Sequence, residues 1–158
     1  MAAAAMAITL LNAPALAGEC AASAAKIARL TNMEIDRSAA NDSGPHEGYV
    51  LPRGEDSIAL FCGPPGTLVI NSIPRMPNRL FMWAAASAIS IVAGRPLTEA
   101  AEQLGLCHEA ALRGENGWSG FRRFGKRAWI IDCNIQDGGR FSFTFYATVR
   151  AAGPGDDE

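Results

Sequence analysis

The sequence predicts one disulfide-stapled α+β domain, in which an antiparallel sheet is built from two β-hairpins with helices packed on one face. Three observations carry this prediction. Two β-rich stretches, about residues 57–73 and 127–149, each contain a turn signal; apolar helical segments lie between them; and four cysteines are widely spaced. A chain of 158 residues, 49% of them hydrophobic, can bury one core.

The N-terminus has most features of a signal peptide. Met1–Ala17 contains an apolar stretch, then Pro14, then small residues at Ala15 and Ala17, where a signal peptidase reads the chain. The basic start is missing, because no Lys or Arg precedes Lys26. We expect residues 1–17 to be removed and the mature domain, residues 18–150, to be periplasmic or secreted. The alternative is an apolar helix that stays on the domain.

The four cysteines agree with export, because all of them lie beyond the expected cleavage point. An even number of widely spaced cysteines in an exported chain predicts two disulfides, and the sequence leaves all three pairings of Cys20, Cys62, Cys107 and Cys133 open. No CxxC occurs, so the sequence suggests neither a thioredoxin-type site nor a zinc knuckle. We therefore expect no metal and no cofactor.

A short first helix is predicted over residues 19–30, and the polar stretch after it, to residue 56, is expected to be mostly loop with a brief strand near residues 33–37. The first hairpin turns at residues 63–66, Gly-Pro-Pro-Gly. Pairing Cys62 with Thr67 places Leu60 opposite Val69. Both faces of this hairpin are largely apolar, so we expect the sheet to be covered, at least in part, on both sides.

Two helices are expected in the middle of the chain. Asn78 is a suitable N-cap for a helix over residues 79–93, which is apolar nearly all round and is therefore expected to be buried, ending at Gly94. Thr98 is expected to cap the next helix. Gly105 should interrupt that helix, and Gly114 should end it.

The second hairpin alternates in two runs, residues 128–135 and 141–149. A three-residue loop at residues 137–139 aligns the apolar faces and pairs Ile135 with Phe141 and Cys133 with Phe143. The last eight residues, 151–158, are expected to form a disordered acidic tail.

The most unusual composition lies between Arg113 and Trp129, where five of the fourteen basic residues are interleaved with aromatic ones. Arginine and lysine donate to anionic groups, and exposed aromatics stack or form interfaces. This pattern indicates a basic-aromatic surface loop, and the candidate binding residues are Trp118, Arg122, Arg123, Lys126 and Arg127. In the alternative interpretation the aromatics face the core and the cations are only solvated.

Catalytic signals are weak. Ser119 lacks the flanking glycine of a nucleophile elbow, and His108, beside Cys107, is expected to be a surface helix residue. A pair of carboxylates for glycoside hydrolysis remains open among Asp36, Asp42, Glu55 and Asp56.

The formal net charge of -2 argues against bulk attraction to nucleic acid, and the apolar helix at residues 79–93 is too short to span a bilayer. We therefore expect a small exported binding protein whose partner is another envelope protein or an anionic envelope component. The alternatives are a small exported hydrolase with paired carboxylates and a subunit of an envelope assembly.

Overall fold

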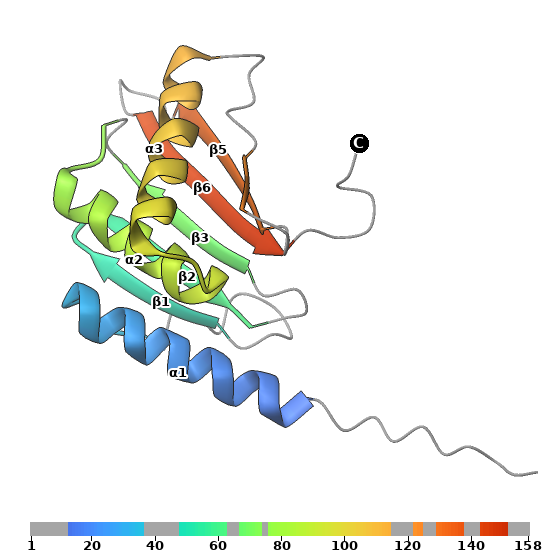
Figure 1. Cartoon of the computed structure of the whole chain (residues 1–158). Helices are drawn as coiled ribbons and strands as arrows, with labels where there is room; N and C mark the ends of the chain where they lie inside the picture. Colours follow the sequence, from blue (N-terminus) through green and yellow to red (C-terminus); the bar gives the residue numbers. More distant parts are fainter. Residues whose placement is uncertain are drawn as a thin grey trace, which may run out of the picture.

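The computed structural model describes residues 13–36, 48–62, 67–73, 76–114, 122–124, 129–137 and 143–151. Within these ranges, three helices lie over one face of a six-stranded antiparallel sheet with the strand order β1-β2-β3-β6-β5-β4 (Figure 1). The elements are α1 (Ala13–Thr31), β1 (Gly48–Arg53), β2 (Asp56–Phe61), β3 (Thr67–Ser72), α2 (Arg79–Ala93), α3 (Leu97–Arg113), β4 (Arg122–Phe124), β5 (Trp129–Asp137) and β6 (Phe143–Ala151). The predicted α+β class, with helices on one face of an antiparallel sheet, is confirmed.

The sheet consists of two three-stranded meanders that meet at its centre, where β3 pairs with β6. Each meander follows a helix in the chain: α1 precedes β1–β3, and α3 precedes β4–β6. Each half also holds one disulfide. Cys20 of α1 bonds Cys62, which directly follows β2, and Cys107 of α3 bonds Cys133 of β5. In each half the bridge therefore joins the helix to the middle strand of the meander: to β5 itself in one half, and to the residue that follows β2 in the other.

The first predicted hairpin exists as β2 and β3, but its register differs by one residue from the prediction. Leu60 pairs with Leu68, and not with Val69, because Phe61 pairs with Thr67 and leaves Cys62 outside the ladder. This register puts the alternating side chains Ile58, Leu60, Leu68 and Ile70 on one buried face. A one-residue slip would have turned one strand's apolar set away from the helices.

The second predicted hairpin exists as β5 and β6, again with a different register. Ile135 pairs with Phe145, not Phe141, and Cys133 pairs with Ala147, not Phe143. The parity of the prediction was right, because odd residues oppose odd residues in both registers. The loop length was wrong. Alternation cannot distinguish loops that differ by an even number of residues, and the ladder here runs out to Asp137 and Phe143.

Both edge strands were missed. Residues 48–53 were expected to be loop, yet they form β1, which pairs with β2 through a two-residue turn in which Gly54 has φ +66°. Pro52 fits here because an edge strand has one side on which no backbone donor is needed. The expected strand near residues 33–37 is reduced to a single bridge between Asp36 and Val50.

Helix α2 has the predicted ends. The Asn78 side chain accepts a hydrogen bond from the Phe81 backbone N–H at 2.8 Å, and Gly94 ends the helix with φ +63°. Helix α3 differs from the prediction at two points. It starts at Leu97 with Pro96 at the N-cap position, so Thr98 lies inside it, and it continues through Gly105 to Gly114 without interruption. A single glycine costs a helix roughly 1 kcal/mol, which tertiary packing readily offsets.

Helix α1 begins earlier than predicted, at Ala13, with Pro14 in its first turn, where a missing N–H is tolerated. Ala24 and Ile27 of α1 are fully buried, and Cys20, Ala21 and Ala28 pack against the core.

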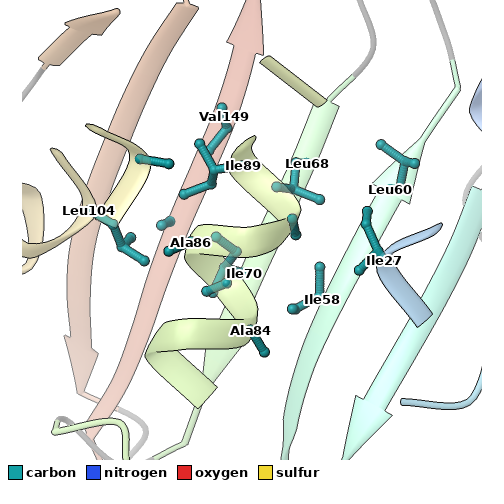
Figure 2. Packing of buried hydrophobic residues seen from close by; sticks show 14 of the residues in the cluster. Ile27, Ile58, Leu60, Leu68, Ile70, Ala84, Ala86, Ile89, Leu104 and Val149 are labelled. Atoms are coloured by element: carbon teal, nitrogen blue, oxygen red, sulfur yellow. The ribbon is translucent and has the colours of Figure 1, made fainter. Parts of the chain in front are cut away.

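The core lies between the helices and one face of the sheet. Figure 2 shows Ile58, Leu60, Leu68 and Ile70 of the sheet next to Ala84, Ala86 and Ile89 of α2 and Ile27 of α1. On the opposite face, the side chains of β2 and β3 are half-buried rather than buried. The hairpin was expected to be covered, at least in part, on both faces; in the described residues the three helices cover one face (Figure 1), and the side chains of the other face are half-buried.

Candidate functional site

The predicted basic-aromatic segment is described at two of its five candidate residues. Trp118, Lys126 and Arg127 lie outside the described residues, whereas Arg122 and Arg123 belong to edge strand β4. Arg122 pairs with Ile131, a member of the core under the helices, and Arg123 pairs with Ile130. Adjacent strand positions belong to opposite faces of a sheet, so the Arg123 position belongs to the face that points away from the helices.

We call that face the open face. Its residues in β2, β3, β5 and β6 that have described side chains are half-buried to exposed, with one exception. Ile130 is 1% exposed, although it does not belong to the core cluster under the helices. The open face therefore combines solvent-accessible positions with at least one buried apolar residue at the β5 side.

Two asparagines lie in one row across the open face. Asn71 of β3 and Asn134 of β5 both pair with position 146 of β6, which places them two strands apart, roughly 10 Å. The Oδ1 atoms of both are buried and have no hydrogen-bond partner. A buried acceptor left unpaired costs about 1–3 kcal/mol, and such groups in a folded protein call for an explanation, such as a donor supplied by water or by a bound molecule.

A second row of the open face contains the predicted basic position. Thr67, Arg150, Ile130 and Arg123 follow one another across β3, β6, β5 and β4. Arg150 and Arg123 therefore flank Ile130 on neighbouring strands. Asp132 lies one row away on β5, so the charge on this side of the face is mixed.

The half of the open face built from β1–β3 contains a group of adjacent apolar residues. Val50, Ala59 and Val69 form one row, and Phe61 of the next row lies beside Ala59 in β2; all four are half-buried. The open face therefore has an apolar part next to a polar part that contains unpaired acceptors and arginine positions.

The carboxylates considered for hydrolysis are dispersed. Asp56 is 7% exposed, lies on the helix-facing side of β2 and accepts a hydrogen bond from the Ser72 hydroxyl at 2.7 Å. Glu55 is exposed in the β1–β2 turn. The Asp36 backbone N–H donates to the carbonyl of Val50, which lies in β1 five positions before Glu55. Asp42 lies outside the described residues. Asp56 therefore has a structural role in linking two strands.

The two remaining polar candidates are also placed. His108 was expected on the surface but is buried, at 8% exposed, because it follows Cys107 on the side of α3 that faces the sheet. Cys107 is in a disulfide, which removes any thiol nucleophile there. Among the described residues, no three His, Cys, Asp or Glu side chains are grouped so as to hold a metal ion.

A surface that the sequence did not indicate lies at the start of α2. Seven large apolar side chains are exposed in the described residues, and four of them fall between residues 73 and 83: Ile73 (37%), Met76 (64%), Leu80 (64%) and Trp83 (47%). We call these four residues the α2 cluster. Helix α2 was expected to be buried, and its residues 84–89 are; among its side chains only Arg79, Leu80 and Trp83, at its start, are exposed.

Leu80 and Trp83 are three residues apart and so share one side of the helix. The sequence of α2 did not indicate that these two side chains are exposed, because buried and exposed apolar residues of a helix look alike in sequence.

Within the described ranges, no single helix has the length and apolar character to cross a membrane; α2 and α3 together meet that criterion but are bent by 118°. Comparisons with models of protein families, with curated proteins and with solved structures found no match for this chain.

Proposed function

We propose that this chain is a small exported interaction protein that binds another protein of the cell envelope through the open face of its sheet and the adjoining β4 edge. The observation that carries the proposal is the row of unpaired acceptors, Asn71 Oδ1 and Asn134 Oδ1. Both asparagine side chains are half-buried, so a partner that turns the two amides toward itself and brings N–H or O–H donors to this row would satisfy both Oδ1 atoms. Hydrogen bonds made on binding would then remove the cost of the unpaired acceptors in the free protein.

The composition of the open face supports a protein partner. Protein interfaces combine apolar contacts with hydrogen-bonding groups and are enriched in arginine. The apolar part around Val69 and Phe61, next to the polar part with Arg150, has this mixture. An anionic envelope component would meet Asp132 beside the arginine row, and we therefore favour the protein.

The disulfides support export. Both are formed, and structural disulfides persist in oxidising compartments.

The test uses the oxidised chain immobilised and incubated with isolated cell envelope, followed by mass spectrometry of the retained proteins. A partner should be retained by the wild type. The Asn71→Ala/Asn134→Ala variant should retain it roughly tenfold less well, because two hydrogen bonds are lost. The variant should remain folded, because the two Oδ1 atoms that it removes accept no hydrogen bond.

Glu102→Gln is the control, because this exposed residue lies on α3, on the side of the sheet opposite the open face (Figure 1). It should bind as the wild type does. The arginines give a second comparison: Arg123→Glu should weaken binding more than Arg122→Glu, because the Arg122 position lies in the helix-facing row. Equal retention by the wild type and the double asparagine variant would refute the proposed surface.

A further inference from the structure

We propose that the outer side of α1 and α2 docks onto an anionic lipid surface, a second binding role that is independent of the protein partner proposed above. The two helices pack side by side and antiparallel, so the end of α1 lies at the same end of the molecule as the start of α2 (Figure 1). The helices cover one face of the sheet, and this docking surface therefore lies opposite the open face.

The apolar part of the surface is the α2 cluster with Leu30, which is 49% exposed in the last turn of α1. Trp83 and Met76 are the residue types of this surface that best suit contact with lipid. Tryptophan is enriched where proteins meet the headgroup region of a bilayer, and methionine adapts its shape to irregular apolar surroundings. Asn78 fixes the start of α2 through its bond to the Phe81 N–H, which holds Leu80 in the first helical turn.

Cations flank these apolar side chains. On α1, Lys26 is exposed one helical turn before Leu30, and Arg29 is exposed directly before it. On α2, Arg79 is exposed next to Leu80 and one turn before Trp83. Helix α2 contains no acidic residue, and α1 contains one, Glu19, eleven residues or roughly 16 Å from Leu30.

Glu34 is exposed shortly after α1, in the segment that leads to the sheet edge at Asp36. An exposed apolar side with several adjacent cations is the pattern of interfacial binding to anionic lipid.

Helix α3 shows that this pattern is specific to one part of the helical layer. Its exposed side contains Glu102, Leu106 and Glu109, at helical spacing. The exposed carboxylates of the helical layer are therefore concentrated on α3, which has one exposed cation, Arg113, in its last turn, and the exposed cations near the α2 cluster lie on α1 and α2. Because a bilayer with anionic lipid would repel the α3 side, the predicted contact is restricted to α1 and the start of α2.

A second copy of the chain is a less suitable occupant. A symmetric pair buries the same patch on both subunits, which would place Lys26, Arg29 and Arg79 close to the same cations of the other copy. An anionic lipid surface neutralises these cations while it accepts the apolar side chains, so charge complementarity selects the lipid.

The experiment is co-sedimentation of the oxidised full chain with vesicles of phosphatidylcholine, with and without phosphatidylglycerol. We expect binding to the vesicles that contain phosphatidylglycerol, weaker binding to the neutral ones, and loss of the difference as salt screens the cations. Leu80→Ser/Trp83→Ser should lower the partition coefficient roughly tenfold or more, since two apolar side chains no longer enter the bilayer. Lys26→Glu/Arg29→Glu should abolish the preference for phosphatidylglycerol.

The matched control is Leu106→Ser, which removes an exposed leucine (38%) from the acidic side of α3 and should leave binding unchanged. Near-ultraviolet circular dichroism establishes that each variant is folded, which is expected because every replaced side chain is exposed. The Asn71→Ala/Asn134→Ala variant should bind vesicles as the wild type does, so the two binding roles can fail separately.

Absence of binding to both kinds of vesicle would overturn the proposal, as would equal binding by the wild type and Leu80→Ser/Trp83→Ser. Formation of a dimer that is lost in Leu80→Ser/Trp83→Ser, without vesicle binding, would assign the surface to a second copy and would equally overturn it.

Discussion

Replacing Cys107 and Cys133 together by alanine removes the bridge between α3 and β5, and replacing Cys20 and Cys62 removes the one between α1 and the end of β2. Chain entropy alone ranks the second bridge as the more stabilising. With sequence separations of 26 and 42, the loop-closure relation gives about 3.5 kcal/mol for the Cys107–Cys133 bridge and about 3.9 kcal/mol for the Cys20–Cys62 bridge.

Burial reverses this order. Cys107 and Cys133 are 0% exposed, whereas Cys20 and Cys62 are half-buried at the margin of the core. Alanine at both buried positions leaves two sulfur-sized voids, each of which costs about 1 kcal/mol. We therefore expect a loss of roughly 5–6 kcal/mol for Cys107→Ala/Cys133→Ala and roughly 4 kcal/mol for Cys20→Ala/Cys62→Ala. The two voids together cost about 2 kcal/mol, which exceeds the difference of about 0.4 kcal/mol between the loop-closure terms of the two bridges.

The assay is equilibrium unfolding in urea, followed by tryptophan fluorescence, on the oxidised wild type and both double variants. The free energy of unfolding is obtained for each variant from its own midpoint and m-value, because removal of a bridge expands the unfolded chain and changes m. A larger loss in Cys20→Ala/Cys62→Ala than in Cys107→Ala/Cys133→Ala would refute the reasoning, because it would mean that loop entropy outweighs burial in this domain.

Three further predictions concern single features. Asn78→Ala should lower stability by about 1 kcal/mol, since the Phe81 N–H loses its acceptor, and Asn78→Ser should restore most of it in urea unfolding; no loss would exclude a capping role. Ser72→Ala should cost about 1–3 kcal/mol, because it removes the 2.7 Å hydrogen bond to the buried Asp56 carboxylate, whereas Ser57→Ala, in the half-buried row of the open face, should cost less; equal losses would contradict the assigned role. The intact mass of the exported protein should correspond to a chain that starts at Gly18 and is about 4 Da lighter than its reduced form; a mass that includes residues 1–17 would contradict cleavage.

The class of the fold was predictable because it depends on local patterns. Asn78 and Gly94 carry capping chemistry that is recognised within four residues, and alternation identified the buried side of β5. The registers were not predictable in the same way. Alternation fixes whether odd or even positions face inward, but Ile135 satisfies that condition opposite Phe141 as well as opposite Phe145, and the length of the ladder decides between them.

The edge strand and the candidate binding surfaces could not be predicted from the sequence. Gly48 and Pro52 weaken the strand signal of β1, yet an edge strand pairs on one side and tolerates both. Leu80 and Trp83 are apolar whether or not another element covers them, and they are exposed because no described element covers the start of α2. Asn71 and Asn134 lie 63 positions apart in the chain and share a row because β6 pairs between their strands.

The division of the sheet into two halves also bears on how the chain acquires its bridges. Cys20 bonds Cys62, and Cys107 bonds Cys133, so each cysteine is joined to its neighbour in sequence and neither loop encloses the other. A chain that enters an oxidising compartment N-terminus first presents Cys62 while Cys107 has yet to arrive. Oxidation in order of arrival then yields the native pairs directly. Oxidative maturation of this domain should therefore require an oxidant but no reshuffling by a disulfide isomerase.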